Sequence, residues 1–421
     1  MGLVGQLPGR RSDFAEAAQP HRHRPDYWLL IISIALLVVG LVVIYSISPA
    51  LGLANNVSSN FYIVRQILAI ILSFIAFFIT SRIPYLSWQK WYKPLLIVAA
   101  AATLLAIIIP VNPAYPAHRW VRLGSLSFQS VELVKFAIIV WLATLLSERI
   151  KQRTINDTKS TLKPLLITLI LVAGIVAGVQ SDLGSTGVIV VIMGSLAFVA
   201  GLPLKRLAMV VGIICIMLVL AISITPYRRE RLMTFLHPTS NCQSASGYQA
   251  CQALISVGSG GVIGLGLGRS VQAYGYLPEA ANDSIFAIYA EKFGFVGVAL
   301  LLALFATFFT RLKIAAERAP DSFSRLFVMG VLVWLSVQTV INIGAMVGLL
   351  PLKGITLPFV SYGGTSVVFV MAAMGVVFQI SHYTNYVTEP IAETRRRVDR
   401  ENNLDGRRHR GSHHPDASGR T

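Results

Sequence analysis

The sequence has few charged residues for its length. Of 421 residues, 13% are Asp, Glu, Lys or Arg and 54% are hydrophobic; a soluble domain carries about twice that charged share. A soluble catalytic domain needs some ~100 residues of mixed composition, and no stretch of this chain offers them. The composition therefore excludes a mainly soluble protein and predicts a polytopic membrane protein.

Cysteine is also scarce, with three residues, too few for a disulfide framework. Cys215 lies in an apolar run, where packing is its expected role. Cys242 and Cys251 share one polar loop and are a disulfide candidate, with two free thiols as the alternative. Only His237 is close to them, so no metal site is predicted. The first apolar run is too long for a cleavable signal and lacks a clear cleavage site.

Acidic residues are half as frequent as basic ones, 19 against 36, which gives a net charge of +17. Of the 36 Lys and Arg, 26 lie in alternate connecting segments and in the two tails. The positive-inside rule then places both termini in the cytoplasm. The Arg-rich stretch Arg395–Arg410 is expected to be disordered and to face membrane lipids or a partner; no nucleic-acid fold accompanies it.

Apolar runs of membrane length recur along the chain and predict an all-α protein with about ten transmembrane helices. A basic N-tail (1–27), a membrane domain (28–382) and an Arg-rich tail (383–421) follow from them, with a large extracytoplasmic loop (226–283) between spans seven and eight. The predicted spans are 28–48, 62–81, 94–111, 132–147, 164–180, 186–203, 207–225, 284–309, 326–349 and 364–382.

The large loop ends at Asp283, directly before the eighth span. A carboxylate at the mouth of a membrane helix is costly unless it has a partner or a task. One interpretation is a helix cap formed by Asn282 or Asp283; the other is a catalytic group.

Several polar segments on the same side offer ligands for a phosphate-bearing lipid. Arg228 and Arg231 can clamp a phosphate or anchor to headgroups. The run Gly258–Gly268 lacks the Lys and the strand–loop–helix context of a phosphate loop, so close packing of short interfacial helices is expected.

Three further segments complete this side of the chain. Glu132 and Lys135 are three residues apart on one helix face, where they can pair with each other or hold a pyrophosphate. Asp182 stands in a tight turn as a turn or cap residue. The irregular stretch from Lys353 to Ser366 predicts a cavity wall, because such backbone is tolerated at membrane depth only inside protein or beside water.

Together these segments resemble the SEDS family, which includes FtsW and RodA. The resemblance covers about residues 28–382, and the KGITLP form of the last motif is more like FtsW than RodA. The motifs are RWVRLG with FQSVELVK, QSDLGSTG, YRRERLMTFLHP, GYQACQALISVGSGG with GLGLGRS, YLPEAANDSIFAIYAEKFGFVG, and KGITLPFVSYGGTS.

The chain departs from the family pattern at a few positions. Ala281 replaces a usual His, Ser284 a usual Phe and Lys292 a usual acidic residue, while Ser130 and Ser181 stand where Pro is common. The Asp that the family uses is retained as Asp283, so the departures bear on how the site is tuned.

The resemblance implies polymerisation of lipid II into glycan strands at the outer face of the bacterial cytoplasmic membrane, with Asp283 as the essential catalytic residue. It implies a multi-pass protein of the division septum. The expected partners are a class B penicillin-binding protein that supplies the transpeptidase, other division proteins and membrane lipids, with no nucleic acid.

The residues suit that chemistry. A lipid pyrophosphate leaves as an anion and needs cations, while the acceptor hydroxyl needs one general base, here Asp283. A divalent cation at the pyrophosphate is left open, and Pro278 disfavours a glycosidase-like pair of Glu279 with Asp283. The expected substrate-binding residues are Arg119, Trp120, Arg122, Gln129, Glu132, Lys135, Asp182, Arg228, Arg231, Lys353, Ser361 and Tyr362.

Other functions compete with this hypothesis. A RodA-like elongation polymerase would share the same residues. A lipid II flippase needs charges along a full transmembrane path, whereas the ionisable residues here cluster at the outer ends of the spans. A non-catalytic division scaffold would use Asp283 only as a cap.

Overall fold

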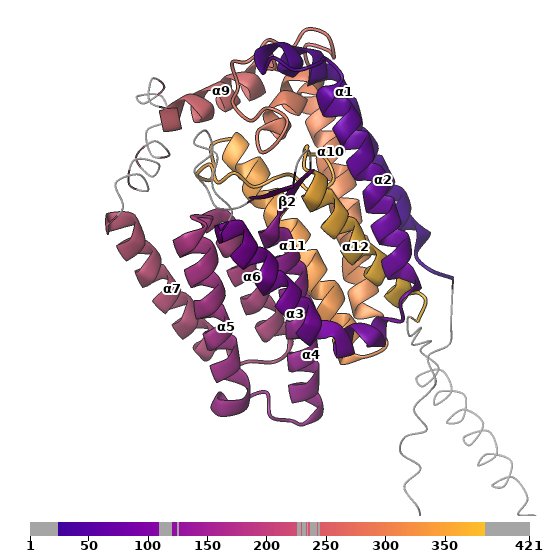
Figure 1. Cartoon of the computed structure of the whole chain (residues 1–421), viewed down its shortest axis with the longest axis vertical. Coiled ribbons are helices and arrows are strands. Elements are labelled where there is room, and N and C mark those ends of the chain that lie inside the picture. Colours follow the sequence, from indigo (N-terminus) through magenta and orange to yellow (C-terminus); the bar gives the residue numbers. More distant parts are fainter. Residues whose placement is uncertain are drawn as a thin grey trace, which may run out of the picture. The chain divides into compact units, whose positions relative to one another are not determined.

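The computed structural model of the chain describes residues 24–108, 120–123, 126–224, 229, 233, 235, 242 and 245–383. Within these, the protein is a bundle of helices with one short antiparallel hairpin (Figure 1), so the predicted all-α class is confirmed. The elements are α1 (Tyr27–Ala54), α2 (Phe61–Arg82), α3 (Tyr85–Ile108), β1 (Trp120–Leu123), β2 (Leu126–Gln129), α4 (Ser130–Lys151), η1 (Thr158–Leu162), α5 (Lys163–Ala173), η2 (Gly174–Val179), α6 (Leu183–Val199), α7 (Leu204–Ile224), α9 (Ala245–Ser259), α10 (Ile285–Glu317), α11 (Ser322–Met346) and α12 (Gly364–Ser381).

Each of the ten predicted spans falls on a helix, with η1, α5 and η2 together forming the fifth. Eight helices among the described residues are long and apolar enough to cross a membrane, and α6 is a shorter apolar helix. The number of spans stays a prediction. The tails and most of 225–244 lie outside the described residues.

The third helix begins nine residues earlier than predicted, at Tyr85 rather than at residue 94. Pro94 lies inside the helix instead of starting it. The first turns hold because Tyr85 and Trp88 are buried, each about 7% exposed, against the rest of the bundle. Much of the segment 82–93, expected to be a connection, is therefore helical.

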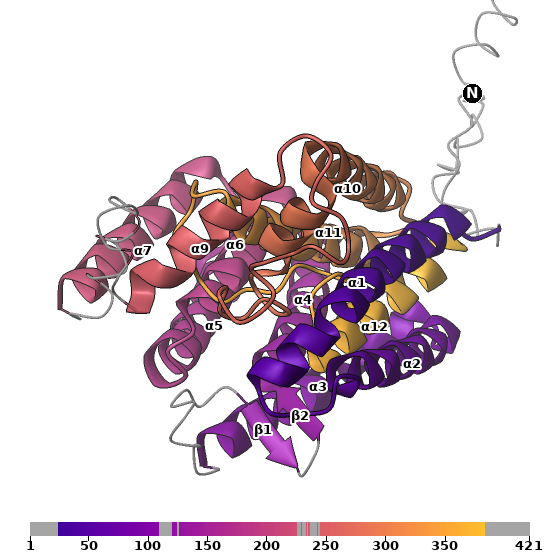
Figure 2. The same ribbon diagram turned by 90° about the horizontal axis from the view of Figure 1, so that it is seen from above.

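Helix α4 lies at the centre of the bundle, with α3, α6, α11 and α12 packed against it (Figure 2). Most of its length is buried inside the protein, whereas α2, α3 and α5 keep large apolar side chains exposed. Such exposure suits a lipid environment, which covers apolar surface at no cost. The buried centre is where polar groups must be paired within the protein.

The eighth predicted span is interrupted. α10 breaks at Gly294, whose backbone has φ 62° and ψ −164°, a conformation essentially restricted to glycine. The glycine run Gly258–Gly268 fills the break with four backbone hydrogen bonds: Leu265 N to Glu291 O, Gly266 N to Lys292 O, Phe295 N to Gly261 O and Val296 N to Val262 O, at 2.9 to 3.1 Å. The run is thus a close-packing element, as expected, but it is not helical after Ser259, so the expected packing of short helices is wrong.

The carboxylate of Glu291 fixes the chain that follows the glycine run. It accepts hydrogen bonds from Ser270 Oγ at 2.5 Å, from Val271 N at 2.9 Å and from Gln272 N at 3.3 Å. Upstream, a disulfide joins Cys242 to Cys251 in α9, with the two Cα atoms 5.7 Å apart. The glycine run and residues 270–272 of the predicted large loop are therefore bound to α10.

We expect Gly294→Ala to lower the thermal unfolding temperature clearly. An added Cβ would lie 2.3 Å from Gly264 N, and the backbone conformation would be strained as well. The expected cost is at least about 2 kcal/mol. Gly258→Ala is the matched control, because nothing lies within 4 Å of its added Cβ. Equal unfolding temperatures for the two variants in detergent would contradict the packing described.

Candidate active site

Asp283 lies in a tight turn just before α10. Asn282 N and Ser284 N both donate to Glu279 O, at 2.9 and 3.2 Å. Ser284 is the N-cap of α10, and its side chain makes no capping hydrogen bond. Its hydroxyl donates instead to Pro278 O at 2.9 Å. The interpretation of Asn282 or Asp283 as the helix cap is therefore wrong.

The main chain of this turn is bound to α11 and to the stretch between α11 and α12. Three consecutive carbonyl oxygens of the turn each accept a hydrogen bond from outside it. Tyr362 N donates to Ala281 O at 2.8 Å, Ser361 Oγ to Asn282 O at 2.7 Å, and Asn342 Nδ2 to Asp283 O at 2.7 Å. We call these bonds the carbonyl clamp. They fix the backbone that carries the Asp283 side chain.

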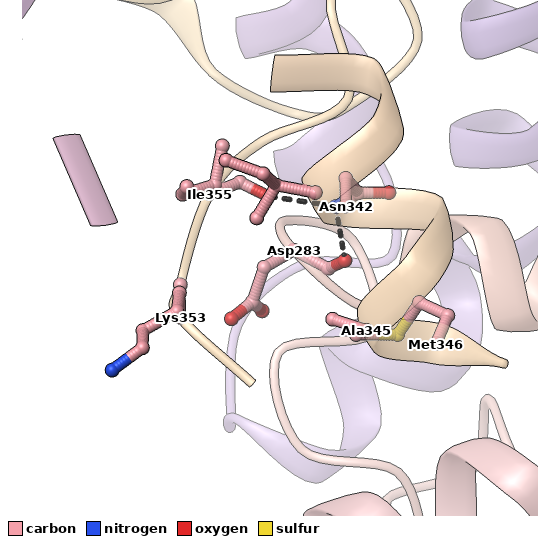
Figure 3. A pocket seen from close by; sticks show the side chains of 8 residues that line it. Asp283, Asn342, Ala345, Met346, Lys353 and Ile355 are labelled. Carbon is pink, nitrogen blue, oxygen red and sulfur yellow. Dashed lines mark hydrogen bonds between the residues drawn. The ribbon is translucent and has the colours of Figure 1, made fainter. Parts of the chain in front are cut away.

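The Asp283 side chain lines a pocket whose walls come from α11 and from the start of the irregular stretch (Figure 3). Its carboxylate points toward Gly354, where a Cβ would lie 3.7 Å from Oδ2, and the residue is 8% exposed. The pocket holds about 170 Å³ of empty space, part of it open to solvent, so it is too small to enclose a lipid-linked sugar. The remaining lining residues are Ile341, Asn342, Ala345, Met346, Lys353 and Ile355.

Glu132 and Lys135 form a buried ion pair in α4, with Lys135 Nζ 2.7 Å from Glu132 Oε1 and both side chains at most 3% exposed. Lys135 also donates to Gln338 Oε1 at 3.0 Å and lies over the Trp334 ring, 5.2 Å from its centre. Neither charge lines the Asp283 pocket. Their partners here are protein groups, which fits the structural alternative stated from the sequence.

Of the other predicted ligands, Lys353 lines the Asp283 pocket. Ser361 serves the carbonyl clamp and also accepts from Leu357 N at 2.7 Å. The Tyr362 ring meets the Tyr62 ring edge-on, with centroids 5.4 Å apart. Burial raises the pKa of the Tyr362 phenol, and the neighbouring Arg65 partly offsets this pKa shift.

Asp182 and Gln129 border the site without entering it. Asp182 caps α6, accepting from Ser185 N at 3.0 Å and from Ser185 Oγ at 2.9 Å. The same turn touches the pocket wall, since a Cβ on Gly184 would lie 2.8 Å from Lys353 O. Gln129 N donates to Thr365 Oγ1 at 3.4 Å. The side chains of Trp120 and Arg122, and all of Arg119, Arg228 and Arg231, lie outside the described residues.

Two amides of α11, Gln338 and Asn342, were not among the site residues predicted from the sequence. Gln338 joins Lys135 to Thr356, whose carbonyl accepts from Gln338 Nε2 at 3.0 Å, and Asn342 joins Asp283 to Ile355. The signal was available, because two amides four residues apart share one face of an otherwise apolar helix. Among the described residues, no group of three or more His, Cys, Asp or Glu could hold a metal ion.

The buried pair predicts non-additive effects on stability. Glu132→Gln and Lys135→Met should each cost about 3–5 kcal/mol, because each leaves one buried charge without its counter-charge. The double variant should cost less than the sum by at least about 1 kcal/mol. Unfolding of the three variants in detergent gives the coupling; strict additivity would contradict the pairing.

Comparison with known proteins places the chain in a family. The family profile described as "Cell cycle protein", built on FtsW, RodA and SpoVE, matches residues 27–386. The chain is 36% identical over 367 residues to the probable peptidoglycan glycosyltransferase FtsW of Coxiella burnetii, covering 85% of this chain and 96% of the relative. It is 35% identical over 364 residues to stage V sporulation protein E of Bacillus subtilis, covering 86% and 98%.

Solved structures agree. A chain from a study of the "structural coordination of polymerization and crosslinking by a peptidoglycan synthase complex" superposes with a TM-score of 0.71 at 26% identity, covering 86% of this chain and 99% of that one. The rod shape determining protein RodA of Thermus thermophilus superposes with a TM-score of 0.62 at 25% identity, covering 86% and 98%. The chain therefore belongs to the FtsW/RodA/SpoVE family.

Proposed function

We propose that this chain is a peptidoglycan glycosyltransferase that polymerises lipid II at the outer face of the cytoplasmic membrane, with Asp283 as the general base. Relatives that align over almost their whole length carry the glycosyltransferase name. One observation supports Asp283 as the base. Its buried carboxylate lines a pocket, and the main chain of the same residue is fixed by a hydrogen bond from Asn342.

The proposed reaction is one displacement. The Asp283 carboxylate takes the proton from the acceptor sugar hydroxyl, and the hydroxyl oxygen attacks the anomeric carbon of the donor sugar. The bond from that carbon to the pyrophosphate breaks, and the pyrophosphate leaves with the electron pair. The anomeric carbon inverts, so no second carboxylate and no covalent enzyme intermediate is needed.

The site supports separate roles for a base and for a cation. The carbonyl clamp holds the backbone of Asp283, so the base does not have to be ordered when the substrates arrive. Lys353 lines the same pocket as the base. Its ammonium points away from Asp283 in Figure 3, and in the proposed reaction it turns to the pyrophosphate and stabilises the developing charge. Because the pocket is small, the lipid and most of the glycan must extend beyond it.

We further propose a division role, a septal location with both termini in the cytoplasm, and a class B penicillin-binding protein as partner. The FtsW names of several relatives support division, with elongation as the alternative, and one structural relative comes from a complex that couples polymerization to crosslinking. A flippase fits less well, since the buried Glu132–Lys135 pair is enclosed by protein partners rather than set along an open path.

Asp283→Asn should insert and fold but reduce polymerisation of labelled lipid II by the purified complex to about 1% or less, because it removes the base at constant size. Glu279→Gln is the control: this carboxylate is close in sequence but exposed, and it accepts from Asn282 Nδ2. Near-normal activity of Asp283→Asn would remove Asp283 from the mechanism, and an inactive Glu279→Gln would favour a paired-carboxylate mechanism.

Neutralising Lys353 should weaken use of the donor. We expect Lys353→Gln to lower kcat/KM for lipid II by about 10-fold or more, since a cation beside the leaving pyrophosphate is lost. The exposed Arg153, in the turn after α4 and predicted to be cytoplasmic, is the matched control for total charge. Equal activity of Lys353→Gln and Arg153→Gln in the same assay would show that Lys353 has no such role.

A further inference from the structure

One face of α11 carries a line of polar side chains, Trp334, Gln338 and Asn342, each four residues after the one before. Gln338 and Asn342 are buried, at 1% and 2% exposure. Buried amides in a membrane bundle are costly unless hydrogen-bonded. The contacts they make with the rest of the bundle therefore show what this face holds in place.

Gln338 uses its full hydrogen-bonding capacity. Its Oε1 accepts from Lys135 Nζ at 3.0 Å and from Trp334 Nε1 at 2.8 Å. Its Nε2 donates to the backbone oxygen of Thr356 at 3.0 Å and to Thr356 Oγ1 at 3.2 Å. With two acceptor and two donor contacts, the amide has one orientation, and it ties the pocket wall to the buried ion pair.

Asn342, one turn further along, binds two main chains with one nitrogen. Its Nδ2 donates to Asp283 O and to Ile355 O, both at 2.7 Å. Figure 3 shows both bonds meeting at this side chain, one from the Asp283 turn and one from the pocket wall. Adjacent residues of the wall, Ile355 and Thr356, are thus each held by one amide of α11.

We propose that Asn342 is a positioning residue for glycosyl transfer: it sets the Asp283 carboxylate against the pocket wall by holding both main chains on one nitrogen. Gln338 holds the next wall residue at a fixed distance from the Glu132–Lys135 pair. The inference rests on the proposed role of Asp283. In this proposal α11, which carries no charge at the site, determines the position of the Asp283 carboxylate.

The chain offers a matched control on the same helix. Thr339 is buried, and its hydroxyl donates to Leu335 O at 2.8 Å within α11. Thr339→Val removes a buried hydrogen bond at constant shape without touching the Asp283 turn. It separates loss of stability from loss of positioning.

The test measures kcat and KM for labelled lipid II together with the unfolding temperature, using the full chain in complex with its transpeptidase partner. Asn342→Leu keeps the approximate size but has no donor. It should lower kcat by about 10–100-fold, because a displacement of about 1 Å costs that much, with KM within about twofold. Asn342→Ser keeps one donor and should lose less, which covers the case in which the leucine variant is too unstable to purify.

The outcomes separate the two proposals. If the Asn342 variants lose no more kcat than Thr339→Val, or if they change only KM, the positioning role is refuted. Asp283→Asn is assayed in the same series. If Asp283→Asn is inactive while Asn342→Leu behaves like Thr339→Val, only the positioning role of Asn342 is refuted. If Asp283→Asn is active, the role of Asp283 as the base is refuted as well.

Discussion

Polar groups buried among apolar helices have no water to bind, so each must find its partner within the protein. The arrangement around Asp283 follows from this constraint. Its turn exposes three consecutive carbonyl oxygens to the interior, and each is met by a donor from the 342–362 region. The same region lines the pocket beside the carboxylate. The hydrogen bonds that satisfy the carbonyl oxygens of the turn therefore also position the Asp283 carboxylate at the pocket.

The break in α10 also contributes to this arrangement. In a continuous helix the backbone N–H and C=O groups near Gly294 would bond within the helix. The break at Gly294 leaves these groups available, and they pair with the backbone of Gly261, Val262, Leu265 and Gly266. Glu291, just before the break, binds the next segment of the chain. The short helical piece that follows Asp283 is thus held at its start by the carbonyl clamp and at its end by the glycine run, which keeps the site stiff.

Much of the fold could be predicted from the sequence, because long apolar runs indicate membrane helices directly. All ten runs became helices, and the irregular Lys353–Ser366 stretch does form part of the pocket wall. The role of Asp283 stays a prediction, although the structure removes the helix-cap alternative. The start of α3 was missed because Pro94 looks like a helix start, while burial of Tyr85 and Trp88 extends the helix before it.

The break at Gly294 and the amides of α11 depend on contacts between distant segments. Hydropathy does not register one glycine or two amides within a long apolar run. The roles of Gln338 and Asn342 become visible only in the folded chain, where they bind Thr356, Ile355 and Asp283.

The central claim is that the Asp283 carboxylate is the group that takes the acceptor proton, and it is tested most directly by geometry. The measurement is a structure of the complex with a donor analogue that cannot react and a short glycan acceptor. The account predicts that the acceptor hydroxyl lies within about 2.6–3.2 Å of an Asp283 oxygen, or is joined to it by one water, on the side of the anomeric carbon opposite the pyrophosphate. A hydroxyl placed beside another base, or separated from Asp283 by the pocket wall, would contradict it.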